Sequence, residues 1–450
     1  MEAIRFGTLV CGLLIAVSQN VAALAGHAVC GHAAVAASGG LPRGEVFRQT
    51  RALTVLGRQF FFDPVLSASG KLACASCHSP EHAFGPSNDL PVQFGGADMK
   101  QPGQRAVPSL KYLQDVPQFT EHFFESEDDG NESVDNGPTG GLTWDGRTDR
   151  GRDQARLPLL SPVEMANESP AAIVYRVRKA GYEAALREVC GPAVFRSVDA
   201  AFAVILDALE AFEQDAATFY PYSSKYDAFL AGQAELTPQE TRGLELFNDP
   251  AKGNCAQCHI SRRGNDGTPP QFTDYGMIAL GVPRNPAILA NADAAYYDLG
   301  LCGPIRTDLG AHLEYCGLFR TPTLRNVALR QTFFHNGVFH SLQQVIEFYV
   351  ERDTDPGKWY SRDAAGRVQK YNDLPLAYQA NLNTDPPFGR HPRATPALDD
   401  TEIEDVIAFL RTLTDGFKPN EGRRWPAPRS AKASVRARLH LNRRRSVVHD

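Results

Sequence analysis

Long apolar segments are scarce in this chain of 450 residues. After residue 25 no segment stays apolar over the roughly 20 residues that a membrane-spanning helix needs, which excludes a span there. Strand-forming runs are few as well, and their scarcity predicts a mainly helical fold with long loops. Cysteine and histidine are sparse, with 9 and 12 residues, so a repeated pattern that combines the two is not expected by chance.

Charge is unevenly distributed along the chain. Residues 421–450 contain nine Lys or Arg and two acids, so the net charge of −6 combines +7 there with −13 elsewhere. A basic end could bind nucleic acid, but a solvated tail is its more common meaning. We therefore interpret residues 421–450 as a disordered tail and predict no nucleic-acid partner.

The first residues have the pattern of an export signal. Arg5 provides a positive charge, residues 7–17 are apolar, and Ala23-Leu24-Ala25 resembles a cleavage site. We predict a signal peptide over residues 1–25, cleaved near Ala25, and a small-residue linker over residues 26–43. The mature protein is then expected in the periplasm.

One short motif occurs twice, as Cys74-Ala-Ser-Cys77-His78 and as Cys255-Ala-Gln-Cys258-His259. Cys-x-x-Cys-His is the attachment pattern of c-type haem, in which the thiols bond to the haem vinyl groups. The adjacent His is placed to bind the iron. The alternatives are a disulfide or half of a zinc site, and neither neighbourhood offers a convincing second pair of zinc ligands. The pattern predicts two covalently bound c-type haems.

The two motif histidines lie 181 residues apart, which suggests two cytochrome c-like helical domains with one haem each. We place the N-terminal haem domain at residues 44–235 and the C-terminal haem domain at residues 236–420. Apolar residues at helical spacing and capping residues predict helices at 45–62, from Ser169-Pro170, at 200–212, from Thr237, and at 403–413.

Two further cysteines, Cys302 and Cys316, flank a loop that contains Gly and Asp. A disulfide that closes this loop is plausible in an oxidising compartment, and two unrelated thiols are the alternative. Cys190 has no evident partner in the sequence.

Several stretches resemble the bacterial di-haem cytochrome c peroxidase and MauG superfamily over about residues 45–415. They are the segment 56–70 before the first motif, Trp144-Asp-Gly-Arg147, Pro162-Val-Glu-Met165, Arg320-Thr-Pro-Thr-Leu-Arg-Asn326 and His335-Asn-Gly337.

This resemblance implies that peroxide reacts at the N-terminal haem and that the C-terminal haem transfers electrons. It implies that His78 and His259 are the proximal iron ligands and that Trp144 lies between the two haems. Glu164 corresponds to the acid/base of the peroxide pocket, a role that heterolysis of peroxide requires. Gln154 and Pro158 stand at the family's spacing in the same pocket.

The sixth iron ligands distinguish the branches of this superfamily. Members that need reductive activation carry a blocking His in a loop that corresponds to residues 95–100, and this loop has none. The first haem is therefore expected to be open, with Met99 as the alternative ligand. At the second haem, the residue fourteen after His335 is Tyr349 where other members have Met, and no Met follows Met277. A Tyr ligand is typical of MauG-like members.

Two departures from the family pattern affect what the resemblance implies. The Trp that passes oxidising equivalents to the protein substrate of MauG corresponds here to Gly253. The family's interdomain calcium uses an Asn that corresponds to Ala106, with carbonyls at Arg330 and Thr332. Calcium remains an open alternative.

Together these features predict a MauG-type di-haem peroxidase that uses hydrogen peroxide to oxidise a partner protein in the periplasm through a high-valent di-haem state. The second interpretation is a cytochrome c peroxidase that detoxifies peroxide with a small cytochrome c or cupredoxin as electron donor. The third is a di-haem electron-transfer cytochrome, and Glu164 argues against it.

Overall fold

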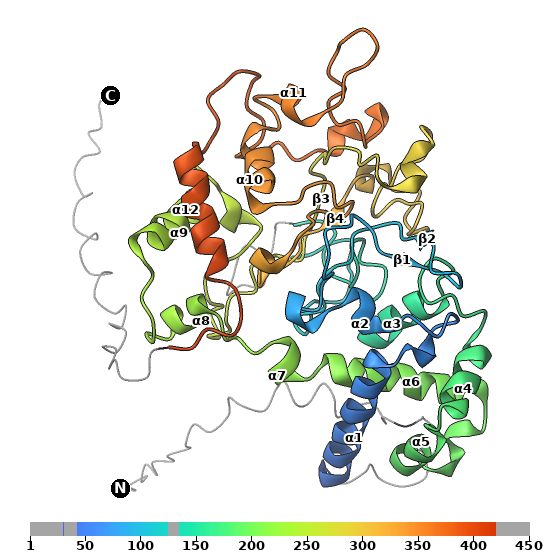
Figure 1. Ribbon diagram of the computed structural model, residues 1–450. Helices are drawn as coiled ribbons and strands as arrows, with labels where there is room; N and C mark the ends of the chain where they lie inside the picture. Colours follow the sequence, from blue (N-terminus) through green and yellow to red (C-terminus); the bar gives the residue numbers. More distant parts are fainter. Residues whose placement is uncertain (1–29, 31–42, 125–134, 420–450) are drawn as a thin grey trace, which may run out of the picture.

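The structure is a computed structural model that describes residues 30, 43–124 and 135–419 (Figure 1). The predicted signal peptide, nearly all of the linker, most of an acidic segment at residues 125–135 and the predicted basic tail lie outside these residues.

The described chain is mainly helical, as predicted, and its few strands are two residues long. Two antiparallel pairs, β1 with β2 and β3 with β4, are the only sheets among the described residues. The α-helices are α1 (Arg43–Phe62), α2 (Cys74–Cys77), α3 (Gly151–Leu160), α4 (Pro170–Lys179), α5 (Glu183–Cys190), α6 (Val198–Glu213), α7 (Ala216–Phe219), α8 (Lys225–Leu230), α9 (Pro238–Asn248), α10 (Leu342–Glu351), α11 (Pro356–Trp359) and α12 (Asp400–Arg411). The 3-10 helices are η1 (Pro64–Leu66), η2 (Pro80–His82), η3 (Pro192–Phe195), η4 (Cys255–Gln257), η5 (Leu289–Ala292), η6 (Leu313–Tyr315), η7 (Val327–Leu329) and η8 (Leu376–Asn381), and the strands are β1 (Phe94–Gly95), β2 (Gln101–Pro102), β3 (Met277–Ile278) and β4 (Phe319–Arg320).

Side chains at the helix starts explain where several predicted helices begin. The Ser169 hydroxyl caps α4, and the Thr237 and Glu240 side chains form the predicted capping box of α9. The stripe predicted at residues 200–212 lies on α6, where eight apolar side chains are buried. The last predicted stripe lies on α12 and the turn that follows it, with Leu413 fully buried.

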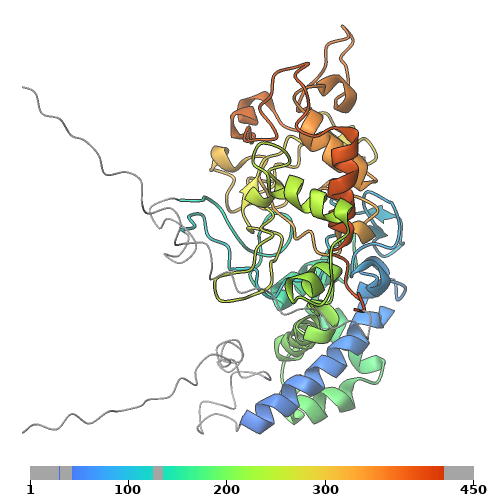
Figure 2. The same ribbon diagram turned by 90° about the vertical axis from the view of Figure 1, so that its left-hand side faces the viewer.

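Two hydrophobic cores divide the molecule into a lower and an upper half in Figure 1. The first core is built around α1 and α6, and the second around α9 and α12. The side view in Figure 2 separates the same two halves, with the N-terminal helices at one end and α10 and α12 at the other. Tyr226 on α8 packs in the second core, although it precedes the domain boundary predicted between residues 235 and 236. The boundary itself stays a prediction.

Each core depends on one glycine at the crossing of its two long helices. A Cβ atom on Gly57 of α1 would lie 1.7 Å from the Ala208 carbonyl oxygen of α6. A Cβ atom on Gly243 of α9 would lie 1.9 Å from the Asp405 carbonyl oxygen of α12. The two halves thus use the same device, in which the absent side chain lets two helix backbones approach closely.

Two disulfides are present among the described cysteines. Cys302 is joined to Cys316, which confirms the loop-closing disulfide. Cys190 is joined to Cys30 in the predicted linker, so the inference that Cys190 has no evident partner is wrong. The partner lies 160 residues away in the sequence, and no local pattern connects the two positions.

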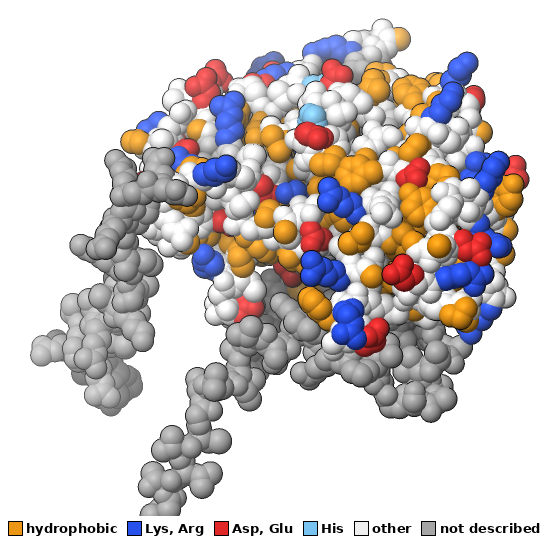
Figure 3. Space-filling model, turned by 60° about the horizontal axis from the view of Figure 1, so that its bottom comes forward, with side chains coloured by type: hydrophobic (Ala, Val, Ile, Leu, Met, Phe, Trp, Pro, Cys, Tyr) orange, Lys and Arg blue, Asp and Glu red, His pale blue; other side chains and the backbone are white. Residues whose placement is uncertain are grey.

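Within the described residues, no helix is long and apolar enough to cross a membrane. On the face shown in Figure 3, acidic and basic side chains are interspersed rather than gathered into a field of one sign.

Substituting Ala for Gly57 should push α1 away from α6 and lower the free energy of unfolding by about 1–3 kcal/mol. Thermal unfolding followed by circular dichroism measures this loss. Gly44→Ala on the same helix is the control, because a Cβ atom there meets nothing within 4 Å. Equal unfolding midpoints for the two variants would contradict the close-approach argument.

Candidate haem centres

The two Cys-x-x-Cys-His motifs keep their cysteines apart from disulfide chemistry. Cys74, Cys77, Cys255 and Cys258 are free, although the other described cysteines are paired. Burial raises the pKa of these thiols, to about 12 for Cys74, Cys255 and Cys258 and to about 11 for Cys77. Reactive thiols usually have a lowered pKa, whereas the pKa of each of these four thiols is raised.

The motif histidines have equivalent environments. Nδ1 of His78 lies 2.9 Å from the Phe84 carbonyl oxygen, and Nδ1 of His259 lies 2.9 Å from the Phe272 carbonyl oxygen. Burial lowers the pKa of both rings to about 4, so each is neutral at pH 7. Because a carbonyl oxygen only accepts, each Nδ1 carries the proton and each Nε2 keeps its lone pair. This is the orientation that an iron-binding histidine requires.

A cavity of about 190 Å³ lies against Cys74, Cys77 and His78. The predicted residues Gln154, Pro158 and Glu164 all line it. Gln154 and Pro158 come from α3, and Glu164 follows that helix in a turn held by the bond from Glu164 N to Ser161 O.

Both the side chain and the backbone of Glu164 have neighbours that hold it in this cavity. Glu164 is exposed to the cavity, but the protein that surrounds its carboxyl group removes enough water to raise the pKa of that group, against the opposing effects of a hydrogen bond from Ser161 and the charge of Arg147. The Gly96 amide donates to the Glu164 carbonyl oxygen at 2.7 Å, and a Cβ atom on Gly95 would lie 2.7 Å from that same oxygen. The glycines of the loop at residues 95–100, which lacks the blocking His, therefore bring its backbone directly against Glu164.

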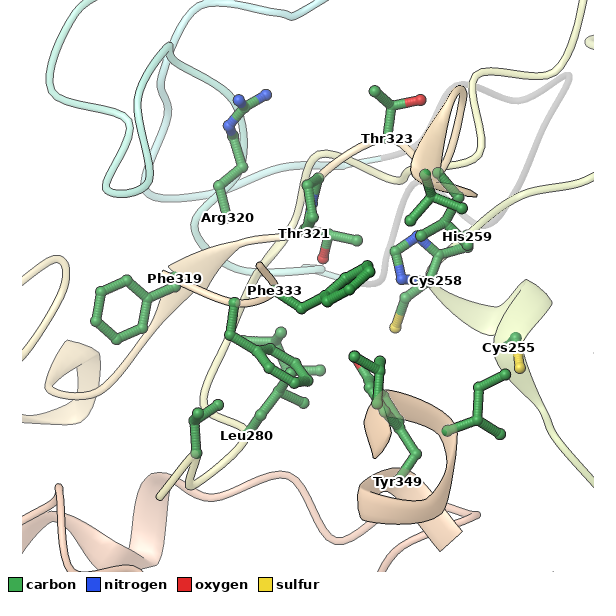
Figure 4. Close-up of a pocket in the computed structure, with 18 of the residues that line it drawn as sticks. Cys255, Cys258, His259, Leu280, Phe319, Arg320, Thr321, Thr323, Phe333 and Tyr349 are labelled. Atoms are coloured by element: carbon green, nitrogen blue, oxygen red, sulfur yellow. The ribbon is translucent and has the colours of Figure 1, made fainter. Parts of the chain in front are cut away.

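A second cavity, of about 230 Å³, lies against Cys255, Cys258 and His259. Tyr349 of α10 lines the opposite wall, and Figure 4 shows its hydroxyl and the His259 imidazole turned toward the same space. Burial raises the pKa of Tyr349 above the ordinary value of a phenol, and nearby Cys258 and Cys255 raise it further. The structure thus brings together the two residues that the sequence assigned to the second iron.

Trp144 stands in the wall between the two cavities and lines both of them. Its indole Nε1 donates to the Ala106 carbonyl oxygen at 2.7 Å, and its own carbonyl oxygen accepts from Arg320 N at 2.8 Å. The Trp144 indole is therefore bonded within the first half of the molecule, and the Trp144 backbone is bonded to the second half.

Two arginines in the larger cavity lack a carboxylate partner among the described residues. Arg320 bonds only to the Thr143 carbonyl oxygen through its side chain, and Arg330 to the carbonyls of Thr332 and Val107. Burial lowers the pKa of both guanidinium groups to about 10. The nearby Tyr275 hydroxyl is buried with no hydrogen-bond partner, and it lines the same cavity.

Burying an unpaired cation, or a phenol without a hydrogen-bond partner, costs free energy unless an acidic group binds it. Other buried arginines in the described chain, such as Arg325 and Arg352, each have an aspartate partner. A haem brings two carboxylates into its site, so the residues in this cavity fit the group that the motif predicts.

Met99, the alternative ligand of the first iron, is not among the residues that line the smaller cavity. The residues at the alternative calcium site do not fit a cation. Ala106 offers no side-chain oxygen, and the Thr332 carbonyl already accepts from the Arg330 guanidinium.

Sequence reasoning missed Glu213, which also lines the smaller cavity. Burial, together with neighbouring Glu210, raises the pKa of its carboxyl to about 8. Glu213 ends the α6 stripe, where a polar residue after apolar ones looks like an ordinary helix end. Only the packing of α6 beside α3 places it in the cavity.

Comparison with known proteins agrees with this geometry. Residues 51–235 match the family model described as di-haem cytochrome c peroxidase. MauG of Paracoccus denitrificans is 32% identical over 81% of this chain and 89% of its own length. The chain belongs to the di-haem cytochrome c peroxidase and MauG family. It is a di-haem peroxidase, and two haems are the cofactors that this family implies.

Known members of the family that are named as peroxidases are also similar to this chain. A solved structure of the di-haem peroxidase BthA from Burkholderia thailandensis has a TM-score of 0.70 and 40% identity, over 81% of this chain and 86% of that one. A cytochrome-c peroxidase of Denitromonas iodatirespirans is 27% identical over 74% of this chain and 83% of its own length.

A buried ion network beside Trp144 joins the two halves. The Arg105 guanidinium lies 2.7 Å from Asp145 and 2.6 Å from Asp298. Burial alone would raise the pKa values of these two aspartates. The charge and hydrogen bonds of Arg105, together with smaller contributions from other neighbours such as Arg147 beside Asp145, outweigh it and hold both pKa values below the usual range.

Arg105→Met should lower the free energy of unfolding by about 3–5 kcal/mol near pH 7, because it leaves two buried carboxylates without their shared cation. Aspartates with a lowered pKa stabilise the fold above their unfolded-state pKa and lose this contribution as the pH falls. The difference between variant and native protein should therefore shrink in acid. Denaturant unfolding at several pH values measures it.

Arg367→Met is the control for this test, because the Arg367 pair with Asp363 is exposed and such pairs contribute about 1 kcal/mol or less. An equal loss in both variants would show that the Arg105 network has no special role.

Proposed function

We propose that this protein is a MauG-type peroxidase of the periplasm, which uses hydrogen peroxide to oxidise a partner protein. The observation that carries the proposal is Tyr349, which faces His259 across the larger cavity. A phenolate is a hard anionic ligand and favours oxidised iron, whereas the soft Met of other members favours reduced iron. A site built in this way suits oxidation of a partner rather than storage of an electron.

In this proposal the haems are attached covalently, through Cys74 and Cys77 in the first half and Cys255 and Cys258 in the second. His78 and His259 would bind the irons through Nε2, and Tyr349 would be a second protein ligand of the iron that His259 holds. The haem irons, when bound, supply the redox chemistry. Their positive charge also offsets the burial that raises the pKa of Tyr349, because a metal ion stabilises the anionic form of its ligand.

Glu164 acts as the acid/base of the smaller cavity. Its raised pKa allows the carboxylate to take a proton from bound peroxide and to return it to the leaving oxygen. Gln154 and Pro158 limit the space beside it, the first with a polar amide and the second with an apolar ring. Trp144, in the wall between the cavities, couples the two haems.

A cytochrome c peroxidase that detoxifies peroxide with a small cytochrome c or cupredoxin remains the second candidate. Gly253 favours it, because a Cβ atom there would lie 2.8 Å from the Leu246 carbonyl oxygen and leaves no room for the Trp of MauG. Turnover of peroxide with reduced cytochrome c distinguishes the two activities. Fast turnover would favour the second candidate.

Glu164→Gln should keep both haems and slow the reaction with peroxide by about 10²–10⁴-fold, the usual cost of losing one positioned acid/base. The native rate should fall as the pH drops through the raised pKa of Glu164, because the carboxylate must be ionised to take the proton. Stopped-flow mixing with peroxide measures both effects.

Glu168→Gln is the matched control, since Glu168 is exposed four residues further along and does not line the cavity. If Glu164→Gln reacts as fast as this control, Glu164 is not part of the mechanism.

Tyr349→Phe should leave both haems attached and turn the second from low-spin to high-spin, because the variant lacks the phenolic oxygen. Tyr349→Met should restore a sixth ligand but raise the reduction potential of that haem. Electron paramagnetic resonance and spectroelectrochemistry measure these changes. Tyr226→Phe, in the same core and bonded to the Ser261 carbonyl, is the control. A low-spin spectrum that survives Tyr349→Phe would leave Tyr349 as ordinary helix packing.

A further inference from the structure

A second tyrosine borders the larger cavity at a place that the proposed chemistry does not use. Tyr112 lines this cavity together with Trp144, His259 and Tyr349. Its side chain is buried, with 1% of the residue exposed, and its hydroxyl donates to Asp415 Oδ1 at 2.6 Å. A phenol beside a redox cavity therefore has a short hydrogen bond to a carboxylate.

Asp415 is held in its ionised form. Lys111 Nζ lies 2.9 Å and Asn326 Nδ2 lies 2.8 Å from Asp415 Oδ2. Burial would raise the pKa of Asp415, but the hydrogen bonds from Tyr112 and Lys111 outweigh it and keep this pKa below the usual range. An ionised carboxylate accepts a proton, so Tyr112 has a base within direct reach of its hydroxyl.

Tyr222 lies next to Tyr112, on the side nearer the protein surface. The two ring centroids lie 5.1 Å apart, edge to face. The Tyr222 hydroxyl accepts from Gln114 and Gln271 at 2.8 and 2.7 Å and donates to Asp115 Oδ2 at 3.3 Å. Tyr222 is half-buried and Asp115 is exposed. Two adjacent rings therefore connect the cavity with solvent, and each hydroxyl has its own carboxylate.

Arg325 fixes the pair and disfavours positive charge on it. Its guanidinium carbon lies 4.7 Å from both ring centroids, and Asp227 binds the guanidinium at 3.0 and 2.9 Å. A nearby cation repels a positively charged ring, so an oxidised ring here must release its proton. Both tyrosines also have positive φ angles, 58° and 47°, which bulky residues rarely adopt. The surrounding structure has to hold this backbone strain.

We propose that Tyr112 and Tyr222 form an electron relay that joins the larger cavity to the protein surface. Tyr112 gives one electron to the peroxide-oxidised haem pair and its phenolic proton to Asp415. The neutral Tyr112 radical then takes one electron from Tyr222 and recovers its proton from Asp415, while Tyr222 passes its own proton to Asp115. An electron-donating partner protein, docked where Tyr222 meets solvent, returns one electron to Tyr222, which regains its proton from Asp115.

This relay rests on the proposed function, because the peroxide-oxidised haem pair is its oxidant. The test mixes the haem-loaded protein with one equivalent of hydrogen peroxide and no partner. Visible absorption follows the oxidation of the haems. Freeze-quench electron paramagnetic resonance detects a tyrosine radical, and ring-deuterated tyrosine incorporated into the protein should narrow the signal of that radical.

Tyr112→Phe should abolish the radical while the haems still become oxidised. The oxidised state should then persist about tenfold longer, because its internal electron donor is gone; this corresponds to ~1.4 kcal/mol in the barrier. Asp415→Asn keeps the phenol but removes its base, and it should lower the radical yield. Tyr222→Phe should keep a radical at Tyr112 and slow the oxidation of an added reduced cytochrome.

Tyr360→Phe is the matched control, because Tyr360 is equally buried and its hydroxyl bonds to the Gly281 carbonyl, which is not a base. An undiminished radical in Tyr112→Phe, an equal loss in Tyr360→Phe, or unchanged cytochrome oxidation in Tyr222→Phe would each overturn the relay. Oxidised haems without any tyrosine radical in the native protein would overturn the relay alone. Haems that peroxide does not oxidise at all would overturn the relay and the proposed function together.

Discussion

The wall between the two cavities depends on one buried cation, Arg105, which bonds to Asp145 beside Trp144 and to Asp298 from the other half. A charge buried at an interface is stable only when its partners are in place, so this network fixes the register of the two halves more strictly than apolar packing does. Trp144 then has one position, with its indole bonded to Ala106 and its backbone to Arg320. Coupling between two redox centres requires this kind of fixed geometry.

The two cores are held together in a different way from the wall between the cavities. Each half is built on a pair of helices that cross at a glycine, and its Cys-x-x-Cys-His motif begins on a short helix that contacts one of the pair. Packing there is apolar and tolerates little extra volume. Buried arginines, acids and phenols line the two cavities and the wall between them, whereas the Arg352–Asp353 pair is buried without lining either cavity. Buried charge therefore contributes to the fold both between the halves and inside one of them.

Burial acts in opposite directions on the groups around the cavities. It lowers the pKa of His78 and His259, which leaves the neutral rings that iron binds. It raises the pKa of Glu164 and Glu213, which places two carboxyl groups in one cavity closer to neutral pH. It also raises the pKa of Tyr112, while Asp415 beside it stays ionised. One physical effect thus shifts these groups in the directions that the proposed metal binding, proton transfer and electron release require.

The sequence by itself determined the local features. Haem attachment motifs, capping boxes and apolar stripes depend on residues a few positions apart, so the helices at Ser169 and Thr237 and the position of Tyr349 could be predicted. Counting fourteen residues from His335 selects Tyr349 on α10, where it lines the larger cavity with His259, and its role as an iron ligand stays a prediction. Only the tertiary structure decided the contacts between distant segments. The Cys30–Cys190 disulfide, the place of Glu213 in the smaller cavity, the carbonyl partners of Arg320 and Arg330, and the Tyr112–Asp415 bond all depend on residues that no local pattern connects. The first two arise from packing inside the first core, and the others from contacts between distant segments. The free energy of such packing is spread over many residues rather than contained in one motif.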